Sequence, residues 1–365
     1  MKRLLVILTS AAFVVISTPS QATLLLYDPF DYTAGERLGG SGTSPLGQIA
    51  PNGQQWITRS PASGGTYVEA NDTLIVAGSM SYPGLASSIG NSVRYGSSAN
   101  NGAGLYTDGI ALGTTFTEGS VYYSMIVRLN GAVNGSIRTS YASFSTESAN
   151  PGTDAGFGLG SSSGTGVPLP ASSWIRNAPS PAPAGSFDLG GGKLSTDGLG
   201  VSAGAPSWQH PSAVYPNQQG NISGLSPLQS YSTIADNTYF MVLKYTFDPL
   251  GDGNDDTVSF WINPAAPTLG YNGGEAEASV GGTYGSYYSA INATVTGTQD
   301  ADQIQSFVLI GQALSSVASQ RSIDVSLDEL RIGTTWADVT PVPEPGVLAL
   351  LGLGLTGLLC LRRRA

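Results

Sequence analysis

The sequence predicts an all-β fold in which two antiparallel sheets pack against each other. Short apolar or β-branched runs alternate in hydropathy with a period of two residues, as half-buried strands do. Gly, Pro, Asn and Asp separate these runs, and helical periodicity is almost absent from residues 23–341. Strands this numerous, with no helices between them, favour a sandwich of two sheets.

The clearest strands are predicted at residues 121–129, 238–247, 257–262, 306–310 and 323–332. In residues 121–129 the odd-numbered positions are apolar and share one face, while Ser124 and Arg128 lie on the other. In the last strand Val325 and Leu327 are expected to face inward with Ile323. Their neighbours Asp324, Ser326 and Asp328 are expected to face outward.

The last predicted strand changes phase part-way along. Beyond Asp328 the alternation breaks, because Glu329 follows directly and Leu330 and Ile332 now hold the apolar positions. A β-bulge near Asp328-Glu329 would produce this shift. We also expect the strand to pair with the opening segment of the mature chain, around residues 24–27.

The middle of the chain, residues 146–237, is rich in loops. It contains Pro-x-Pro patches, a run of three glycines at 190–192 and the one histidine, His210. A structureless loop of this length inside one domain would be unusual, so short strands are predicted at 156–160 and 187–189. A linker between two domains is the alternative.

The two ends of the chain are predicted to be targeting segments. Lys2 and Arg3 precede an apolar stretch, and small residues at 20–22 suit a signal peptidase, so residues 1–22 are predicted to be a signal peptide. Five of the 15 basic residues and one of the 25 acidic residues lie in the two ends, which leaves 24 acidic and 10 basic residues in the body. A body this acidic argues against nucleic acid as a partner. The sole cysteine, Cys360, lies in the tail, so the body has no disulfide.

The tail, residues 341–365, carries three features in order. Pro343, Glu344 and Pro345 precede an apolar run at 346–361, and the arginines Arg362, Arg363 and Arg364 follow it. As a helix, this run would span about 24 Å, slightly less than a hydrocarbon core. The tail resembles the PEP-CTERM sorting signal of Gram-negative bacteria. The resemblance implies a precursor anchored in the inner membrane, processing by an exosortase-type transpeptidase, and delivery to the cell surface or extracellular matrix. An ordinary membrane anchor with an accidental Pro-Glu-Pro is the alternative.

Three blocks of the body, residues 26–35, 256–264 and 327–339, carry a second resemblance. They are similar to the concanavalin A-like, LamG-type jelly rolls, which implies an antiparallel two-sheet jelly-roll sandwich over residues 23–340. This fold hosts lectins, glycosidases and adhesive modules alike, so the resemblance does not fix a function.

Enzymatic activity is not expected. A glycosidase needs two positioned carboxyl groups, but Glu275 and Glu277 read as a solvated strand edge, and Asp328-Glu329 belong to the closing strand. Residues 160–164 match G-x-S-x-G, yet a helix cannot follow that serine because Pro168 comes too soon.

Two binding sites remain candidates. Asp252, Asn254 and Asp256 alternate as calcium ligands do, although a plain hairpin turn explains the same residues and no other cofactor is indicated. Trp174 and Trp208 lie in the loop-rich middle and are candidate ligand contacts, whereas Trp56, Trp261 and Trp336 are expected in the core. We therefore expect an exported, non-enzymatic surface or matrix protein. A carbohydrate-binding module that contacts extracellular polysaccharide is the alternative, and a glycoside hydrolase is less favoured.

Overall fold

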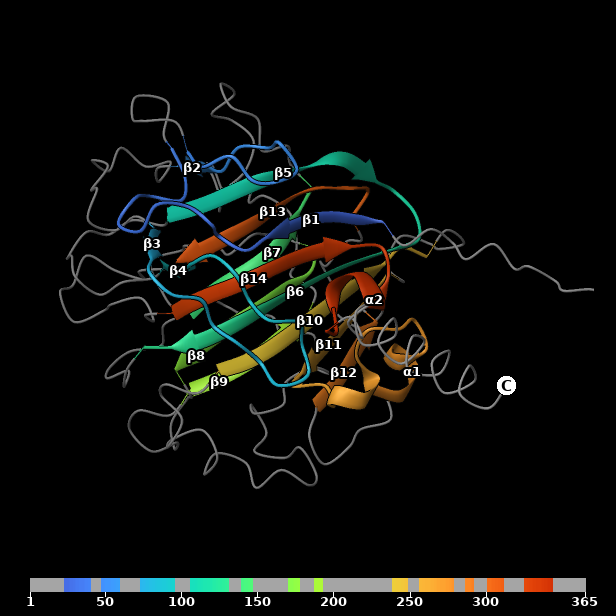
Figure 1. Ribbon diagram of the computed structural model, residues 1–365. Coiled ribbons are helices and arrows are strands. Elements are labelled where there is room, and N and C mark those ends of the chain that lie inside the picture. Colours follow the sequence, from blue (N-terminus) through green and yellow to red (C-terminus); the bar gives the residue numbers. More distant parts are fainter. Residues whose placement is uncertain are drawn as a thin grey trace, which may run out of the picture.

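The computed structural model describes residues 23–40, 47–59, 73–95, 106–130, 139–146, 170–177, 187–192, 238–248, 256–278, 286–291, 301–311 and 325–343. These segments form two antiparallel sheets (Figure 1). The predicted signal peptide and the strand predicted at 156–160 lie outside them.

The larger sheet, sheet A, has eight strands in the order β12-β11-β10-β6-β14-β4-β3, and β1 also pairs with β14. Its strands are β1 (Leu24–Asp28), β3 (Leu74–Val76), β4 (Ser92–Tyr95), β6 (Ser120–Leu129), β10 (Thr238–Thr246), β11 (Thr257–Ile262), β12 (Ser286–Ile291) and β14 (Val325–Gly333).

Sheet B has six strands in the order β2-β5-β13-β7-β8-β9. They are β2 (Ile57–Arg59), β5 (Tyr106–Phe116), β7 (Thr139–Ser145), β8 (Ser172–Asn177), β9 (Phe187–Gly192) and β13 (Ile304–Gly311). β8 and β9 come from the loop-rich middle and extend this sheet beyond β7. All five strands read most clearly from the sequence are present, and β9 begins at the predicted residue.

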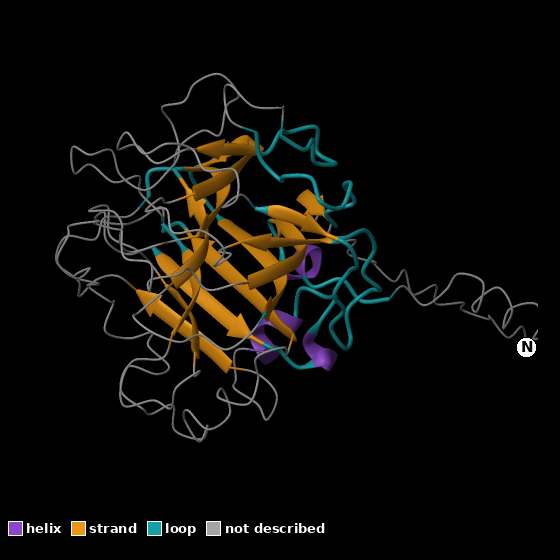
Figure 2. Ribbon diagram, turned by 90° about the vertical axis from the view of Figure 1, so that its left-hand side faces the viewer, coloured by secondary structure: helices purple, strands orange, loops and turns teal. Residues whose placement is uncertain are grey.

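The main core lies between the two sheets (Figure 2). Sheet A contributes Tyr123 and Leu327, and sheet B contributes Phe144 and Phe307, all of them fully buried. Tyr123 packs edge-on against both phenylalanines, with ring centroids 5.0 and 5.1 Å apart. The predicted two-sheet sandwich is therefore confirmed.

A second apolar cluster covers the outer face of sheet A. Trp261 and Val242 project from the strands, and Met80, Leu85 and Leu269 cover them from the segments beside the sheet. Two short helices, α1 (Gly274–Ala278) and α2 (Trp336–Val339), and a 3-10 turn, η3 (Ala266–Thr268), lie on this side. The expectation that Ser326 and Asp328 face water is wrong, because both are buried: Asp328 contacts Ser79 and Met80, and Ser326 contacts Asn130. A period of two shows that a strand has two faces, but it does not show what covers the second one.

The closing strand β14 lies inside sheet A, between β6 on one edge and β4 and β1 on the other. Residues 325–327 pair with β4, and residues 330–333 pair with β1, with Leu26 opposite Ile332. Figure 1 shows β1 and β14 side by side, although they come from opposite ends of the chain. The predicted pairing of the two ends is confirmed.

The bulge predicted in β14 is also present. Asp328 pairs with Ile126 and Arg331 pairs with Ser124. Between these two pairs β14 has one residue more than β6, which defines a bulge. Glu329 is the extra residue and has a φ of 55°. Because of it, Leu327 and Leu330 both face the core.

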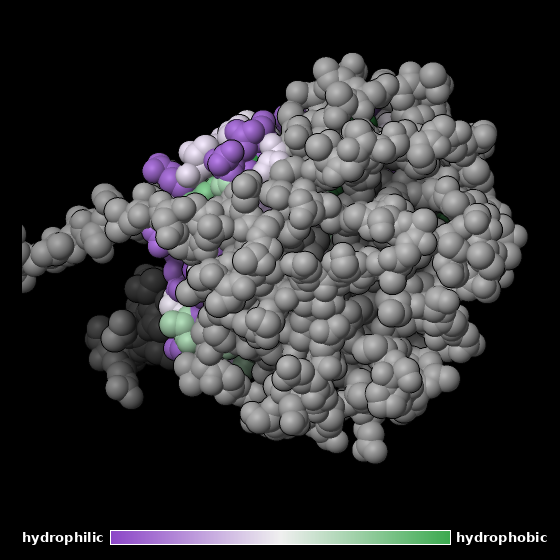
Figure 3. Space-filling view, turned by 180° about the vertical axis from the view of Figure 1, so that it is seen from behind, coloured by the Kyte–Doolittle hydropathy of each residue, from purple (hydrophilic) through white to green (hydrophobic). Residues whose placement is uncertain are grey.

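The described surface exposes several large apolar side chains: Leu24, Ile49, Leu74, Ile89, Tyr271 and Val342. Seen from behind, the described surface is mainly hydrophilic with small hydrophobic patches (Figure 3). Among the described residues, no helix has the length and hydropathy needed to cross a membrane.

Candidate functional site

The C-terminal end of the body is where the fold meets the tail. β14 ends at Gly333, and α2 follows after Thr334 and Thr335. The Thr335 hydroxyl accepts from the Asp338 amide at 3.3 Å, and the Asp338 carboxylate accepts from the Thr335 amide at 2.9 Å. This reciprocal capping box sets the start of the helix. Gly333 leaves room for it, since a Cβ there would lie 2.5 Å from the Asp338 Cβ.

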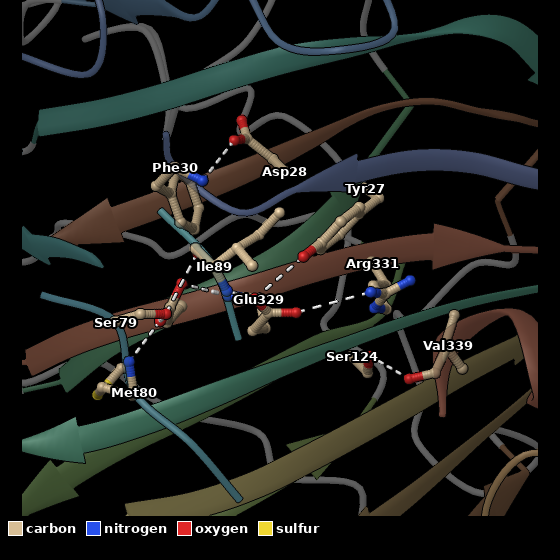
Figure 4. A network of polar contacts seen from close by, with 11 residues as sticks. Tyr27, Asp28, Phe30, Ser79, Met80, Ile89, Ser124, Glu329, Arg331 and Val339 are labelled. Atoms are coloured by element: carbon tan, nitrogen blue, oxygen red, sulfur yellow. Dashed lines mark hydrogen bonds and ion pairs between the residues drawn. The ribbon is translucent and has the colours of Figure 1, made fainter. Parts of the chain in front are cut away.

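Trp336 fastens α2 to the outer layer. Its indole Nε1 donates to the Thr268 carbonyl at 2.7 Å, and its ring meets Trp261 edge-on at 5.0 Å. On the strand side, the Ser124 hydroxyl donates to the Val339 carbonyl at 2.5 Å (Figure 4). α2 is therefore held from both sides although it is only four residues long.

The chain stays in contact with the body for three residues beyond α2. Thr340 is buried, and its hydroxyl accepts from the Gly270 amide at 3.1 Å. The Pro341 carbonyl accepts from the Ala86 amide at 2.9 Å. Val342 and Pro343 are exposed. The other predicted sorting residues, Glu344, Pro345 and Arg362–Arg364, lie outside the described residues.

The bulge in β14 brings together two acidic side chains and the loop that follows β3 (Figure 4). Asp328 Oδ2 accepts from the Ser79 hydroxyl and the Met80 amide, both at 2.6 Å, and Oδ1 accepts from the Glu329 amide at 2.7 Å. The bulge lies where the edge partner of β14 changes from β4 to β1. The Asp328 carboxylate thus ties the covering loop to the sheet at that junction.

Glu329 makes the neighbouring contacts. Its Oε1 accepts from the Tyr27 hydroxyl at 3.1 Å and from the Ile89 amide at 3.3 Å. Its Oε2 lies 3.6 Å from Arg331 Nη2, and the Arg331 guanidinium stacks 3.7 Å from the centroid of the Tyr27 ring. Glu329 therefore links β14 to β1 and to Ile89, and Asp328 links it to Ser79 and Met80.

Burial dominates the electrostatics at this junction. It raises the pKa of Asp328 to about 7, although the hydrogen bonds from Ser79, Met80 and Glu329 favour the ionised form. Burial also raises the pKa of Glu329, with the nearby Arg331 acting in the opposite direction. These two carboxyl groups are the nearest approach to a catalytic pair in the sequence, and both are occupied by contacts within the fold.

The buried carboxyl group of Asp28 was also not expected from the sequence. Asp28 ends β1, and its carboxylate accepts from the Phe30 amide at 2.8 Å, the Tyr32 hydroxyl at 2.7 Å and the Trp56 indole at 2.8 Å. Burial raises the pKa of Asp28. The available signal was an aspartate that directly follows an apolar strand and precedes Pro29 and Phe30. An aspartate before a turn can accept a hydrogen bond from the amide two residues on, as Asp28 does from Phe30.

Asp256 is the one predicted calcium ligand that the structure describes. It is buried at the start of β11, where Oδ2 accepts from the Tyr245 hydroxyl and Oδ1 accepts from the Asp248 amide at 2.7 Å. These bonds close the β10–β11 hairpin, as the turn interpretation requires. Asp252 and Asn254 lie outside the described residues, so calcium binding stays a prediction. The described residues contain no group of three or more His, Cys, Asp or Glu side chains that could hold a metal.

Of the five tryptophans singled out in the sequence, the structure describes four. Trp56, Trp261 and Trp336 are buried, as expected, although Trp336 belongs to a helix rather than a strand. Trp174 lies in β8, opposite Tyr141 on β7 and Gly190 on β9, and Trp208 lies outside the described residues.

The pair Glu275 and Glu277 is not on a strand edge. Both residues belong to α1, and Glu275 accepts from Lys244 at 2.8 Å and from the Tyr122 hydroxyl at 2.6 Å. The alternation of Glu and Ala over five residues fits a strand as well as a helix. Packing against the outer layer selects the helix here.

Comparison with known protein families identifies the motif in the tail. Residues 341–364 match the family described as the PEP-CTERM protein-sorting motif. The chain carries a PEP-CTERM sorting motif. Proteins with this motif are exported and sorted to the cell envelope of Gram-negative bacteria, and the motif implies processing by an exosortase-type enzyme. The PEP-CTERM motif begins at Pro341, so its first residues are among those held by the body.

The body is similar to several solved structures at low identity. One is the carbohydrate esterase vb_24B_21 from the Shiga toxin-encoding bacteriophage phi24B, with 12% identity, a TM-score of 0.34, and coverage of 86% of this chain and 99% of the other. The carbohydrate recognition domain of Emp47p has 11% identity, a TM-score of 0.33, and coverage of 87% and 98%. Lectin I-B4 from Griffonia simplicifolia has 10% identity, a TM-score of 0.30, and coverage of 76% and 98%. No curated protein sequence matches this chain.

Proposed function

We propose that this protein is a non-enzymatic component of the cell surface or extracellular matrix, where its β-sandwich contributes to the surface or biofilm matrix. The observation that carries the proposal is the sorting motif at residues 341–364, which follows the body without a spacer. The last buried residue of the sandwich, Thr340, directly precedes the motif. An envelope-sorting signal joined to a compact sandwich fits display of the whole body as one rigid unit.

The route to the surface uses both ends of the chain. Residues 1–22 act as a signal peptide, and the apolar run at 346–361 anchors the precursor in the inner membrane with Arg362–Arg364 on the cytoplasmic side. An exosortase-type transpeptidase then processes the tail near Pro343-Glu344-Pro345 and releases the body for delivery.

The contacts of the acidic side chains support a non-enzymatic role. A glycoside hydrolase needs two carboxyl groups that face a shared substrate site. Asp28, Asp328 and Glu329 instead accept hydrogen bonds from backbone amides and side chains of the fold. Asp28 holds the turn that follows β1, and Asp328 and Glu329 tie β14 to the segments beside it.

Carbohydrate binding is the second candidate function, and the register of β8 favours it. Trp174 on β8 is paired with Tyr141 on β7 and with Gly190 on β9, so these three residues form one row across sheet B. Aromatic residues on one row, next to a glycine on the neighbouring strand, suit stacking against a sugar ring.

A glycan array separates the candidates. The secreted protein is applied to the array, and any glycan that binds is then incubated with the protein and assayed for released reducing ends. A structural role predicts no binding. A lectin-like role predicts binding without release, which Trp174→Ala abolishes and Tyr271→Ala, a change at an exposed aromatic on the opposite side of the sandwich, leaves intact. Release of reducing ends would contradict the non-enzymatic proposal.

A further inference from the structure

The body contains a binding site, here called the seat, for the first residues of its own sorting motif. Two loops of the outer layer form it: one carries the Ala86 amide, which donates to the Pro341 carbonyl, and the other carries the Gly270 amide, which donates to the Thr340 hydroxyl. The Thr340 hydroxyl also donates to the Trp336 carbonyl at 2.8 Å. The chain is thus bonded on both sides as it leaves the body.

Val342 completes the seat from above. Its side chain lies over Gly270, where an added Cβ would come within 2.6 Å of Val342 Cγ2. Gly270 also has a φ of +82°, which side-chain-bearing residues rarely adopt. The exposed fraction rises from 0% at Thr340 to 36% at Val342, so the chain emerges within two residues.

We propose that Thr340, Pro341 and Val342 form a latch against Ala86 and Gly270, and that the processing enzyme acts on the motif only while this latch is open. The inference rests on the proposed function, because it takes processing of the motif as given. An enzyme that cuts or transfers a peptide bond binds the chain in an extended form on both sides of that bond. In the latched chain Thr340 is buried and the Pro341 carbonyl is bonded to the body, so an enzyme cleft cannot surround the chain at these two residues.

Opening the latch does not require unfolding of the body. The residues that precede it are fixed by stronger contacts: Trp336 is buried between Trp261 and the Thr268 carbonyl, and Val339 is held by Ser124. Release of the chain therefore stops at Val339. It exposes three residues and breaks few hydrogen bonds, a local opening of low free energy.

The latch is tested by the rate of processing of the full-length precursor in its host, followed by pulse-chase with the sorting enzyme at a limiting level. Under that condition the rate follows the open fraction of the latch. Thr340→Val removes the hydroxyl, keeps the shape and leaves residues 341–364 unchanged. Because it removes both hydrogen bonds of that hydroxyl, we expect processing to accelerate about threefold to tenfold. A Gly-Ser-Gly-Ser insertion between Thr340 and Pro341 separates the motif from the body and should accelerate it at least as much.

Thr246→Val is the matched control, since the Thr246 hydroxyl contacts the Ser120 hydroxyl, at 2.9 Å between β10 and β6, away from the latch. It should leave the rate unchanged. Unchanged or slower processing in both latch variants would overturn the proposal. Hydrogen exchange on the purified full chain gives a second readout: the Ala86 amide should exchange faster in Thr340→Val, while the amides of β6 keep their protection.

An Ala86 amide that is equally protected in both proteins would also overturn the latch. If the wild-type precursor is never processed, the proposed function fails instead. The exchange of Ala86 still tests the latch in that case.

Discussion

At the scale of single residues, the most consequential side chain is Asp328, because it is buried and joins three segments of the chain. Its carboxyl group has a pKa of about 7 in the folded protein, well above the ordinary value near 3.8 that applies when the chain is unfolded. Between these two values the folded state holds a proton that the unfolded state has lost. The contribution of this group to stability is therefore greatest below about pH 4 and declines as the pH rises toward 7.

Replacing Asp328 with Asn should remove this pH dependence. In Asp328→Asn the side-chain NH2 group would replace an oxygen that accepts from the Met80 amide or the Glu329 amide. Two hydrogen-bond donors would then face each other, so the change should destabilise the body by about 1–3 kcal/mol. The free-energy gap between wild type and variant should be largest near pH 4 and shrink up to pH 7. Urea melts at several pH values measure it, with the exposed Asp31→Asn as control. A gap that grows with pH would show that Asp328 is ionised in the folded protein.

Leu327 tests the inward face of the same strand. It is fully buried between the sheets, so Leu327→Ala should lower the free energy of unfolding by about 2–5 kcal/mol. Thr334→Ala, at a partly exposed position just after the strand, should stay within about ±0.5 kcal/mol. Ser326 is no substitute for that control, because it is buried and accepts a hydrogen bond from Asn130 at 2.7 Å. A small effect at Leu327 in denaturant melts would argue against its place in the core.

At the scale of elements, the closing strand completes the fold. β14 lies inside sheet A, so its removal takes one hydrogen-bonded neighbour from β6 and from β4, and also removes the pairing with β1. Truncation after Gln320 should therefore abolish cooperative folding rather than shorten a tail. Circular dichroism during heating checks this. A truncated chain with a cooperative transition near the full-length temperature would show that the sandwich closes without β14.

The β10–β11 hairpin carries the calcium prediction. If Asp252, Asn254 and Asp256 bind the ion, millimolar calcium should raise the melting temperature of the protein and chelation should lower it. Asp252→Asn should remove this response. Asp256→Asn should also weaken the hairpin without calcium, since Asp256 accepts bonds from Tyr245 and Asp248. Identical melts with calcium and with chelator would leave the loop as a turn alone.

Alternation within single strands predicted the long elements well, and it predicted the bulge at Asp328-Glu329 from the change of phase. It could not predict the covering of sheet A, because Met80, Leu85 and Leu269 lie in segments with no periodicity of their own. The buried roles of Asp28 and Asp328 were missed for a related reason. A carboxylate in a strand reads as solvent-facing unless its donors, here from distant loops, are known.

At the scale of the whole molecule, the two ends of the body meet. β1 pairs with β14, and α2 then leads the chain through Thr340 to the sorting motif. The closing strand is thus also the attachment point of the tail. The contacts of the exit could not be predicted from the sequence, which assigned Pro341 and Val342 only to the tail. The sorting motif itself needed no structure, since its order of Pro-Glu-Pro, apolar run and arginines is contiguous.

The central claim is that the sorting motif is processed and the body is displayed without its tail. C-terminal mass spectrometry of the protein isolated from the native cell surface tests it most directly. The claim predicts a C-terminal peptide that ends near Pro343-Glu344-Pro345 and lacks residues 346–365. It also predicts that Glu344→Ala leaves full-length precursor in the inner membrane, while Glu118→Ala, an exposed change between β5 and β6, is processed normally. A surface protein that still carries Arg362–Arg364 would contradict it.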